Sequence, residues 1–274
     1  MAELIGQQKL KDTLSSYTLD TVPRTLMLLG DEGCGKRSFA TYLANHLGLM
    51  IVNVGADVSD TDIIEYQISP VDRMYVIDLR LFTDKQQNKL LKFIEEPTET
   101  CFIVLLANSE FGVLDTILNR CIRLHFAQYT FDEMKQIAVF HSNYNEQTYA
   151  VCNTPGQLAE LDDTTIASTQ KLCRALISSL TDQHYGRTLS VYTKINYAEE
   201  YDLINFNVFF NMMISESLNL YKEHNSERFL KVYMLTQSYL KNLNIAPKAN
   251  RSDFMISYLS EFFKEVISND PSRT

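Results

Sequence analysis

A glycine-rich segment at residues 30–36, Gly-Asp-Glu-Gly-Cys-Gly-Lys, has the residue types and the spacing of a phosphate-binding loop. In such a loop the backbone N–H groups point at phosphate oxygens, the following helix adds its positive end, and the lysine supplies a fixed charge. An apolar run precedes the segment and a helix-forming stretch follows it, as this kind of loop requires. We therefore expect a nucleotide-binding loop formed by Gly30, Gly33, Gly35 and Lys36. The alternative is a structural relic whose glycines only make a tight turn.

Two positions near this loop lack the groups that ATP hydrolysis needs. Magnesium is normally held by a hydroxyl directly after the lysine, and that residue is Arg37 here. A second strand offers Asp78 at its end, but Leu79 stands where a glutamate would polarise the attacking water. Ser38 is one residue further along the helix, and that step turns a side chain by about 100°. We predict that the loop holds ATP or ADP without hydrolysing it, and we predict no metal site.

Composition and charge limit the remaining function classes. The chain has 274 residues, 45% of them hydrophobic, with a net charge of −9, which argues against coating nucleic acid by bulk electrostatics. No apolar run is long enough to cross a membrane and the first residues are unlike a secretory signal, so we expect a cytoplasmic protein without membrane contact. The five cysteines form no CxxC pair, which predicts neither a disulfide framework nor a zinc site. They are Cys34, Cys101, Cys121, Cys152 and Cys173.

Short apolar runs separated by helix-forming stretches predict an α/β first domain with a parallel sheet covered on both faces. The runs are residues 26–29, 50–54, 74–79, 101–107 and 121–126, and the clearest helices are 36–47 and 83–96. After residue 130 the helical period dominates, with a turn signal at residues 153–157. We expect three domains: an α/β domain at 1–128, a small helical domain at 129–165 and an all-α domain at 166–274.

Two apolar stripes at helical spacing mark the last domain. We expect them to form its core, and the alternative is packing against neighbouring subunits. The first stripe is Phe206, Phe209, Phe210, Met213, Ile214 and Tyr221. The second is Met255, Tyr258, Leu259, Phe262, Phe263 and Val266.

An ordered series of motifs resembles the clamp-loader branch of the AAA+ family, most closely the delta-prime subunits of bacterial DNA polymerase III. Residues 4–14 resemble the opening helix of the family, with its Ile-Gly-Gln element near the adenine, and residues 88–97 resemble its LLKxxEEP helix. Residues 103–121 are similar to its sensor strand and TILSRC element, and residues 153–161 to the turn of its lid domain. The resemblance implies a P-loop AAA+ domain, a helical lid domain and a helical collar domain that joins the subunits in a ring.

The same resemblance assigns roles to individual residues. Arg120 stands at the position of the arginine finger that touches the terminal phosphate of a nucleotide on the neighbouring subunit. Asn108 lies near the first sensor position, where a simple turn residue is the alternative, and Gln157 replaces a nucleotide-sensing arginine of the lid. Lys89 and Lys92 lie on the helix that faces the ring centre in this family, where they would contact DNA phosphates or simply be solvated. The four-cysteine zinc insertion of bacterial relatives is absent, which allows a phage or mobile-element version.

We expect a hydrolysis-deficient clamp-loader subunit that offers Arg120 to a neighbouring ATPase. Its expected partners are clamp-loader ATPase subunits, a delta-like subunit that opens the clamp, the sliding clamp, and primed DNA within the complex. Two alternatives stay open at this point. One is a weak but active AAA+ ATPase, and the other is an AAA+ adaptor such as a helicase loader.

Overall fold

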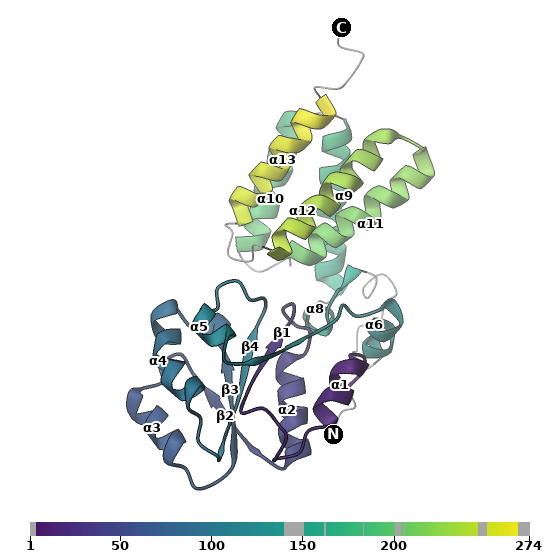
Figure 1. The fold of residues 1–274 in the computed structure, drawn as a ribbon. Coiled ribbons are helices and arrows are strands. Elements are labelled where there is room, and N and C mark those ends of the chain that lie inside the picture. Colours follow the sequence, from purple (N-terminus) through teal and green to yellow (C-terminus); the bar gives the residue numbers. More distant parts are fainter. Residues whose placement is uncertain are drawn as a thin grey trace. The chain divides into compact units, whose positions relative to one another are not determined.

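The structure is a computed structural model that describes residues 4–139, 151–161, 163–182, 184–200, 204, 206–245 and 251–267. The chain divides into two compact units (Figure 1). The first consists of residues 1–137 with 154–156, and the second of residues 138–153 with 157–274. The expected domain boundaries at residues 128 and 165 stay predictions.

A five-stranded sheet forms the centre of the first unit (Figure 1). All its strand pairs are parallel, in the order β2-β3-β4-β1-β5. The strands are β1 (Thr25–Leu29), β2 (Met50–Val54), β3 (Arg73–Asp78), β4 (Cys101–Ala107) and β5 (Ile122–His125). The five predicted strands and the predicted fold class, a parallel α/β sheet followed by a largely helical part, are confirmed.

Alternate residues of the central strands enter two separate cores, one on each face of the sheet. Met27, Tyr75 and Ile103 face one core, together with residues of the helices that follow β2, β3 and β4. Leu26 and Val104 face the other core, against the first two helices of the chain. A strand buried on both faces loses no apolar side chain to solvent, so these strands read as unbroken apolar runs rather than as alternating patterns.

The two helices predicted at residues 36–47 and 83–96 begin and end within about one residue of the predicted bounds. Gly48 ends the helix predicted at residues 36–47 with a left-handed backbone, φ +70°. Thr83 and Gln86 form a capping box at the start of the next predicted helix, and Ser59 and Asp62 form another. The elements are α1 (Gln8–Ser15), α2 (Lys36–Leu47), α3 (Asp60–Ile68), η1 (Leu79–Leu81), α4 (Asp84–Glu95), α5 (Asp115–Leu118), α6 (Phe131–Ala138) and α8 (Pro155–Glu160), of which α8 continues into the second unit.

The second unit is a bundle of long helices (Figure 1), and buried aromatic side chains form much of its core. Its helices are α9 (Asp163–Thr181), α10 (Tyr185–Glu200), α11 (Phe206–His224), α12 (Glu227–Ile245) and α13 (Arg251–Ile267). Most residues of the two predicted stripes are buried, which confirms the core assignment for Phe206, Phe209, Phe210, Met213, Met255, Tyr258, Leu259 and Phe262. Ile214, Tyr221 and Phe263 are half-buried, and the side chain of Val266 lies outside the described residues. Among the described residues, no helix is long and apolar enough to span a bilayer.

One buried glutamine joins α4 to the segment that leads to α5. The Nε2 of Gln87 donates to the carbonyl of Gly112 at 2.9 Å, and its Oε1 accepts from the N–H of Leu114 at 3.1 Å. Gln87 is 1% exposed, so water does not replace these bonds. The position of α5, which immediately precedes Arg120, therefore depends on this side chain.

We expect Gln87→Leu to lower the free energy of unfolding by about 1 kcal/mol, because it removes two hydrogen bonds to partly buried backbone groups. The exchange of the Leu114 amide hydrogen should accelerate in the same variant. The control is Asn88→Leu on the exposed side of α4, which should change stability by no more than about 0.5 kcal/mol. Unchanged exchange at Leu114 in Gln87→Leu would contradict this role.

Candidate nucleotide site

The strand order brings three chain segments with polar residues to one edge of the sheet. Strands β3, β4 and β1 are neighbours, and parallel strands end at the same edge. The glycine-rich loop follows β1, Asp78 ends β3, and Asn108 follows β4. In parallel α/β sheets ligands bind outside the carboxyl ends of the strands, so this edge is the candidate nucleotide site.

The glycine-rich loop has the backbone conformation that its sequence predicts. Gly33 has φ +76° and Gly35 has φ +97°, values that other residues rarely adopt. Gly35 directly precedes α2, so the loop ends on the positive end of that helix. Gly30 packs so closely that an added Cβ would lie 2.7 Å from the Cβ of Phe126. All four predicted binding residues, including Lys36, lie on this one loop and the first residue of its helix.

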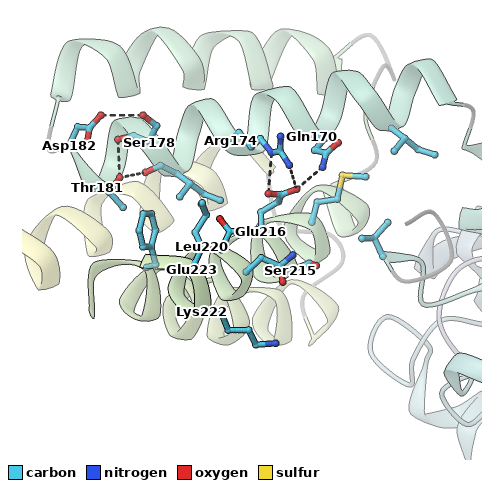
Figure 2. Close-up of a pocket in the computed structure, with 16 residues that line it drawn as sticks. Gln170, Arg174, Ser178, Thr181, Asp182, Ser215, Glu216, Leu220, Lys222 and Glu223 are labelled. Atoms are coloured by element: carbon cyan, nitrogen blue, oxygen red, sulfur yellow. Dashed lines mark hydrogen bonds and ion pairs between the residues drawn. The ribbon is translucent and has the colours of Figure 1, made fainter. Parts of the chain in front are cut away.

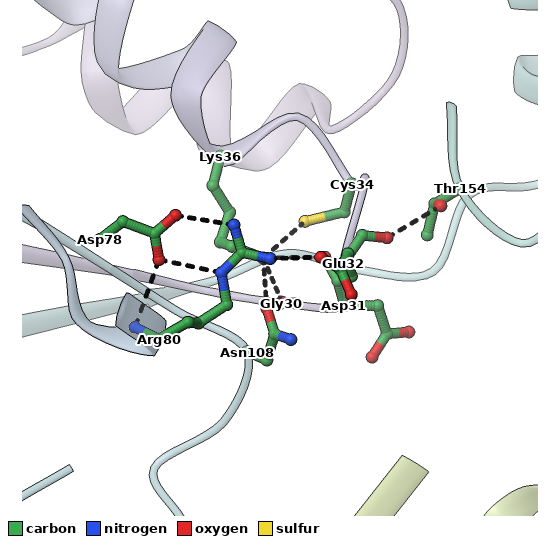
Figure 3. A network of polar contacts seen from close by, with 9 residues as sticks. All are labelled: Gly30, Asp31, Glu32, Cys34, Lys36, Asp78, Arg80, Asn108 and Thr154. Atoms are coloured by element: carbon green, nitrogen blue, oxygen red, sulfur yellow. Dashed lines mark hydrogen bonds and ion pairs between the residues drawn. The ribbon is translucent and has the colours of Figure 1, made fainter. Parts of the chain in front are cut away.

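The ammonium group of Lys36 is enclosed by the loop and by Asn108 (Figure 3). Its Nζ donates to the carbonyl oxygens of Gly30 at 2.6 Å and Asp31 at 2.9 Å, and to the Oδ1 of Asn108 at 3.0 Å. Lys36 is only 6% exposed, and burial lowers its pKa. The structure thus brings together the predicted loop lysine and the predicted sensor residue.

An arginine occupies the other side of the site (Figure 3). The Nε and Nη2 of Arg80 donate to the two carboxylate oxygens of Asp78 at 2.9 and 2.7 Å. Its Nη1 donates to Oε1 of Glu32, in the glycine-rich loop, at 2.6 Å. The side chain of Asp78 is 7% exposed, that of Arg80 35% and that of Glu32 74%. One planar guanidinium therefore bridges the end of β3 and the loop after β1.

Burial and the contacts between Asp78 and Arg80 shift the pKa values of the groups at this site. Burial alone would raise the pKa of Asp78, but hydrogen bonds from Arg80 and its charge outweigh burial and hold that pKa below its usual 3.8. The hydrogen bonds to Asp78 raise the pKa of Arg80. Burial raises the pKa of the nearby Cys34 thiol to about 11, so this cysteine stays a neutral thiol.

The residues that replace catalytic groups lie near the loop but engage other partners. Arg37 is exposed, and its Nη1 donates to Oδ1 of Asn53 on β2 at 2.9 Å. Leu79 is buried in the core under η1 rather than exposed to the site. Ser38 is exposed on the first turn of α2.

The predicted turn at residues 153–157 is the start of α8, and part of it contacts the glycine-rich loop. The N–H of Gly156 donates to the carbonyl of Gly33 at 2.9 Å, and an added Cβ at Gly156 would lie 2.5 Å from the Cα of Gly33. Thr154 donates through Oγ1 to the carbonyl of Glu32 at 3.0 Å. Gln157, the predicted substitute for a sensing arginine, is buried, and its Oε1 accepts from the N–H of Asn153 at 2.8 Å.

The Ile-Gly-Gln element is tied to the segment that follows β5. Gln7 exchanges two hydrogen bonds with the backbone of Ala127, at 2.7 and 2.9 Å. Two residues later, Tyr129 donates through its Oη to the carbonyl of Cys34 at 2.8 Å. These contacts connect the start of the chain and the end of the sheet to the glycine-rich loop.

The predicted finger and the predicted DNA-contacting lysines lie on other parts of the first unit. Arg120 follows α5, and its side chain is 39% exposed. Its Nη2 contacts Oε1 of Glu95 at 2.9 Å, and its Nη1 donates to the carbonyl of Thr116 at 2.7 Å. Lys89 and Lys92 are exposed on α4. The structure does not bring these three residues to the glycine-rich loop.

The second unit contains an open groove of about 930 Å³ between α9 and α11 (Figure 2). Glu216 is its central acid, and Arg174 and Gln170 hold both carboxylate oxygens at distances of 2.6 to 3.2 Å. The Glu216 carboxylate is therefore already paired within the groove. Over the described parts of both units, no cluster of three or more His, Cys, Asp or Glu side chains could hold a metal ion.

Sequence reasoning identified the loop, Asp78 and Asn108, but it missed Arg80 and Glu32. A signal was present, because an arginine two residues after a strand-end aspartate can turn back onto that carboxylate. Asp78 accepts from the backbone N–H of Arg80 at 3.3 Å, and this local turn brings the guanidinium back to the same side chain. The contacts of Tyr129 and Thr154 carried no comparable signal.

The first unit therefore has a five-stranded parallel sheet with a glycine-rich loop after β1 and an aspartate at the end of β3, with β4 between these two strands, an arrangement typical of P-loop proteins. Residues 64–130 match the sequence family described as DNA polymerase III, delta subunit. The replication factor C large subunit of Methanococcus aeolicus is 32% identical over 69 residues, which cover 23% of this chain. The matched segment spans only 15% of that relative. These two findings support an AAA+ clamp-loader family for this chain.

Solved structures of RuvB from Thermotoga maritima, a Holliday junction branch migration motor, are also similar. One matches with a TM-score of 0.47 and 18% identity, over 63% of this chain and 64% of the other. A second RuvB structure has a TM-score of 0.47 and 18% identity, over 70% of each chain. At these scores the likeness carries no argument about the function of this chain.

We expect Asp78→Asn to lower the free energy of unfolding by about 1.5–3 kcal/mol at neutral pH, because it removes a charged acceptor of the Arg80 guanidinium. Since the pKa of Asp78 is lowered in the folded protein, its stabilisation is present above the usual 3.8 and is lost as the pH falls through the folded value. The difference in the free energy of unfolding between wild type and variant should therefore shrink as the pH falls below about 3.8, measured by urea unfolding.

The matched control for this experiment is Glu110→Gln, which breaks the exposed ion pair of Glu110 with Arg123. An exposed pair contributes about 0–1 kcal/mol, so this variant should be nearly as stable as the wild type. Equal losses in Asp78→Asn and Glu110→Gln would contradict the importance of the Asp78–Arg80 pair.

Proposed function

We propose that this chain is a hydrolysis-deficient, delta-prime-like clamp-loader subunit. In a ring with ATPase subunits and a delta-like clamp-opening subunit, it would help to place a sliding clamp on primed DNA. The family match at residues 64–130 supports the clamp-loader assignment, because it covers the acidic strand end, α4 and the segment of Arg120. Its nucleotide, ATP or ADP, would be held by Gly30, Gly33, Gly35 and Lys36.

The proposed loss of hydrolysis is supported by the groups around the loop. Phosphoryl transfer needs a bound metal and an oriented nucleophile, and both positions are changed here. Arg37 replaces the metal-binding hydroxyl and contacts Asn53, and Leu79 is buried where a water-polarising carboxylate is needed. A loss of even a few kcal/mol of transition-state stabilisation slows turnover by orders of magnitude.

The proposed role of Arg120 is supported by its place and by its contacts. Its guanidinium is partly exposed, and Glu95 and the carbonyl of Thr116 each hold one of its terminal nitrogens. A guanidinium held in this way needs little reordering when it meets a phosphate of a neighbouring subunit. An arginine supplied in trans contributes about 10³–10⁵ in rate in well-studied systems. Exposed Lys89 and Lys92 on α4 would contact DNA phosphates in the same assembly.

Arg120→Ala should lower the DNA-stimulated ATPase rate of the assembled loader by about tenfold or more, equivalent to about 1.4 kcal/mol in the activation barrier. The measurement is steady-state hydrolysis by the complex formed with its ATPase subunits, with assembly checked by size-exclusion chromatography.

The matched control is Arg123→Ala, since Arg123 is another partly exposed arginine in a single ion pair of the same domain. This variant should leave the rate within about twofold of wild type. An intact complex in which Arg120→Ala is as fast as Arg123→Ala would exclude the finger and leave this proposal without its central residue.

A further inference from the structure

We infer that Arg80 takes the place of a divalent metal at the carboxylate of Asp78. The guanidinium of Arg80, rather than a bound ion, then supplies the positive charge at this site. A P-loop site normally holds magnesium between the phosphates, a hydroxyl after the lysine and an aspartate at the end of another strand. The residues of this chain do not fit such an ion. The inference deepens the proposed function, because it concerns the same loop.

The first argument is that the ligand atoms are already used. Both carboxylate oxygens of Asp78 accept hydrogen bonds from Arg80, at 2.9 and 2.7 Å. Magnesium needs carboxylate oxygen at about 2.0–2.1 Å in near-octahedral geometry, and it would have to displace this paired guanidinium. A bidentate arginine–carboxylate pair is among the strongest arrangements of charged hydrogen bonds in proteins.

The second argument is that Arg80 makes the bridge that a metal would otherwise make. The remaining guanidinium nitrogen of Arg80, Nη1, donates to Oε1 of Glu32 on the glycine-rich loop at 2.6 Å (Figure 3). The loop after β1 and the end of β3 are therefore joined through one positive group. Arg37, the other arginine at this site, is aimed at Asn53, so the bridge depends on Arg80.

The third argument is the local charge balance. The carboxylates of Asp78 and Glu32 both contact the guanidinium of Arg80. The charges of Lys36 and Arg37 act on Asp78 through space. Removing Arg80 would leave two carboxylates beside the space that its guanidinium fills. Two carboxylates with room for water are the protein ligands that a magnesium or manganese ion prefers. The arginine thus both neutralises and occupies a site that would otherwise attract such an ion.

Binding of Mn²⁺ alone, followed by electron paramagnetic resonance on the full chain, tests this inference. We expect wild type to bind Mn²⁺ no better than Arg123→Ala, the control that frees the exposed carboxylate of Glu110. Arg80→Ala should bind at least about tenfold more tightly, because metal affinity follows the number of charged ligands available. Adding Asp78→Asn to that variant should abolish the gain.

A second variant, Arg80→Gln, removes the charge while keeping a long polar side chain, and it carries the same expectation if Arg80→Ala does not fold. Wild type that binds Mn²⁺ as tightly as Arg80→Ala would overturn the inference. So would a folded Arg80→Ala or Arg80→Gln chain that binds no more tightly than Arg123→Ala. The titration needs no nucleotide and no partner subunit, so its failure is distinguishable from a failure of the proposed Arg120 role.

Discussion

The ion pair between Arg80 and Asp78 is the interaction on which the chemistry of the glycine-rich loop depends. It lies where the neighbouring strands β3, β4 and β1 end, and it extends through Glu32 into the loop itself. A mostly buried carboxylate without a partner is costly, so Asp78 needs a cation in every state of the folded chain. In an active ATPase that cation is a metal that arrives with the nucleotide. Here the guanidinium of Arg80 pairs with Asp78, so this carboxylate has a cationic partner before any ligand binds.

In the function proposed above, nucleotide binding is separated from hydrolysis, two activities that a P-loop domain usually combines. The backbone conformation of the loop is kept, with left-handed glycines at 33 and 35 and an enclosed Lys36. Contacts from Gly156, Thr154 and Tyr129 hold the loop from outside. Arg37 and Leu79 occupy the two positions where hydrolysis by a P-loop ATPase is expected to need a hydroxyl and a glutamate. In the proposed ring such a domain would be a fixed member, and the contacts of Arg120 with Glu95 and the Thr116 carbonyl would hold its guanidinium in place for a neighbouring nucleotide.

The sequence predicted most of the fold, because a parallel sheet buried on both faces leaves unbroken apolar runs and its helices carry strong end signals. The five strands and the helix at residues 36–47 agree with the structure to within one or two residues at most ends. The loop and Asn108 directly follow strands and Asp78 ends one, so the same apolar runs located them. Arg80 and Glu32 were missed because a surface arginine has many possible directions, and only the η1 turn sends this one back to Asp78. The tie from Gln87 to Leu114 depends on tertiary packing that one sequence does not encode locally.

The central claim is that the chain keeps a phosphate loop but has no hydrolytic chemistry of its own. Single-turnover hydrolysis of radiolabelled ATP by the purified chain, alone and with magnesium, tests this claim most directly. The account predicts that wild type forms ADP no faster than Lys36→Ala, in which the loop has lost its fixed charge. Turnover by wild type that Lys36→Ala abolishes would contradict it.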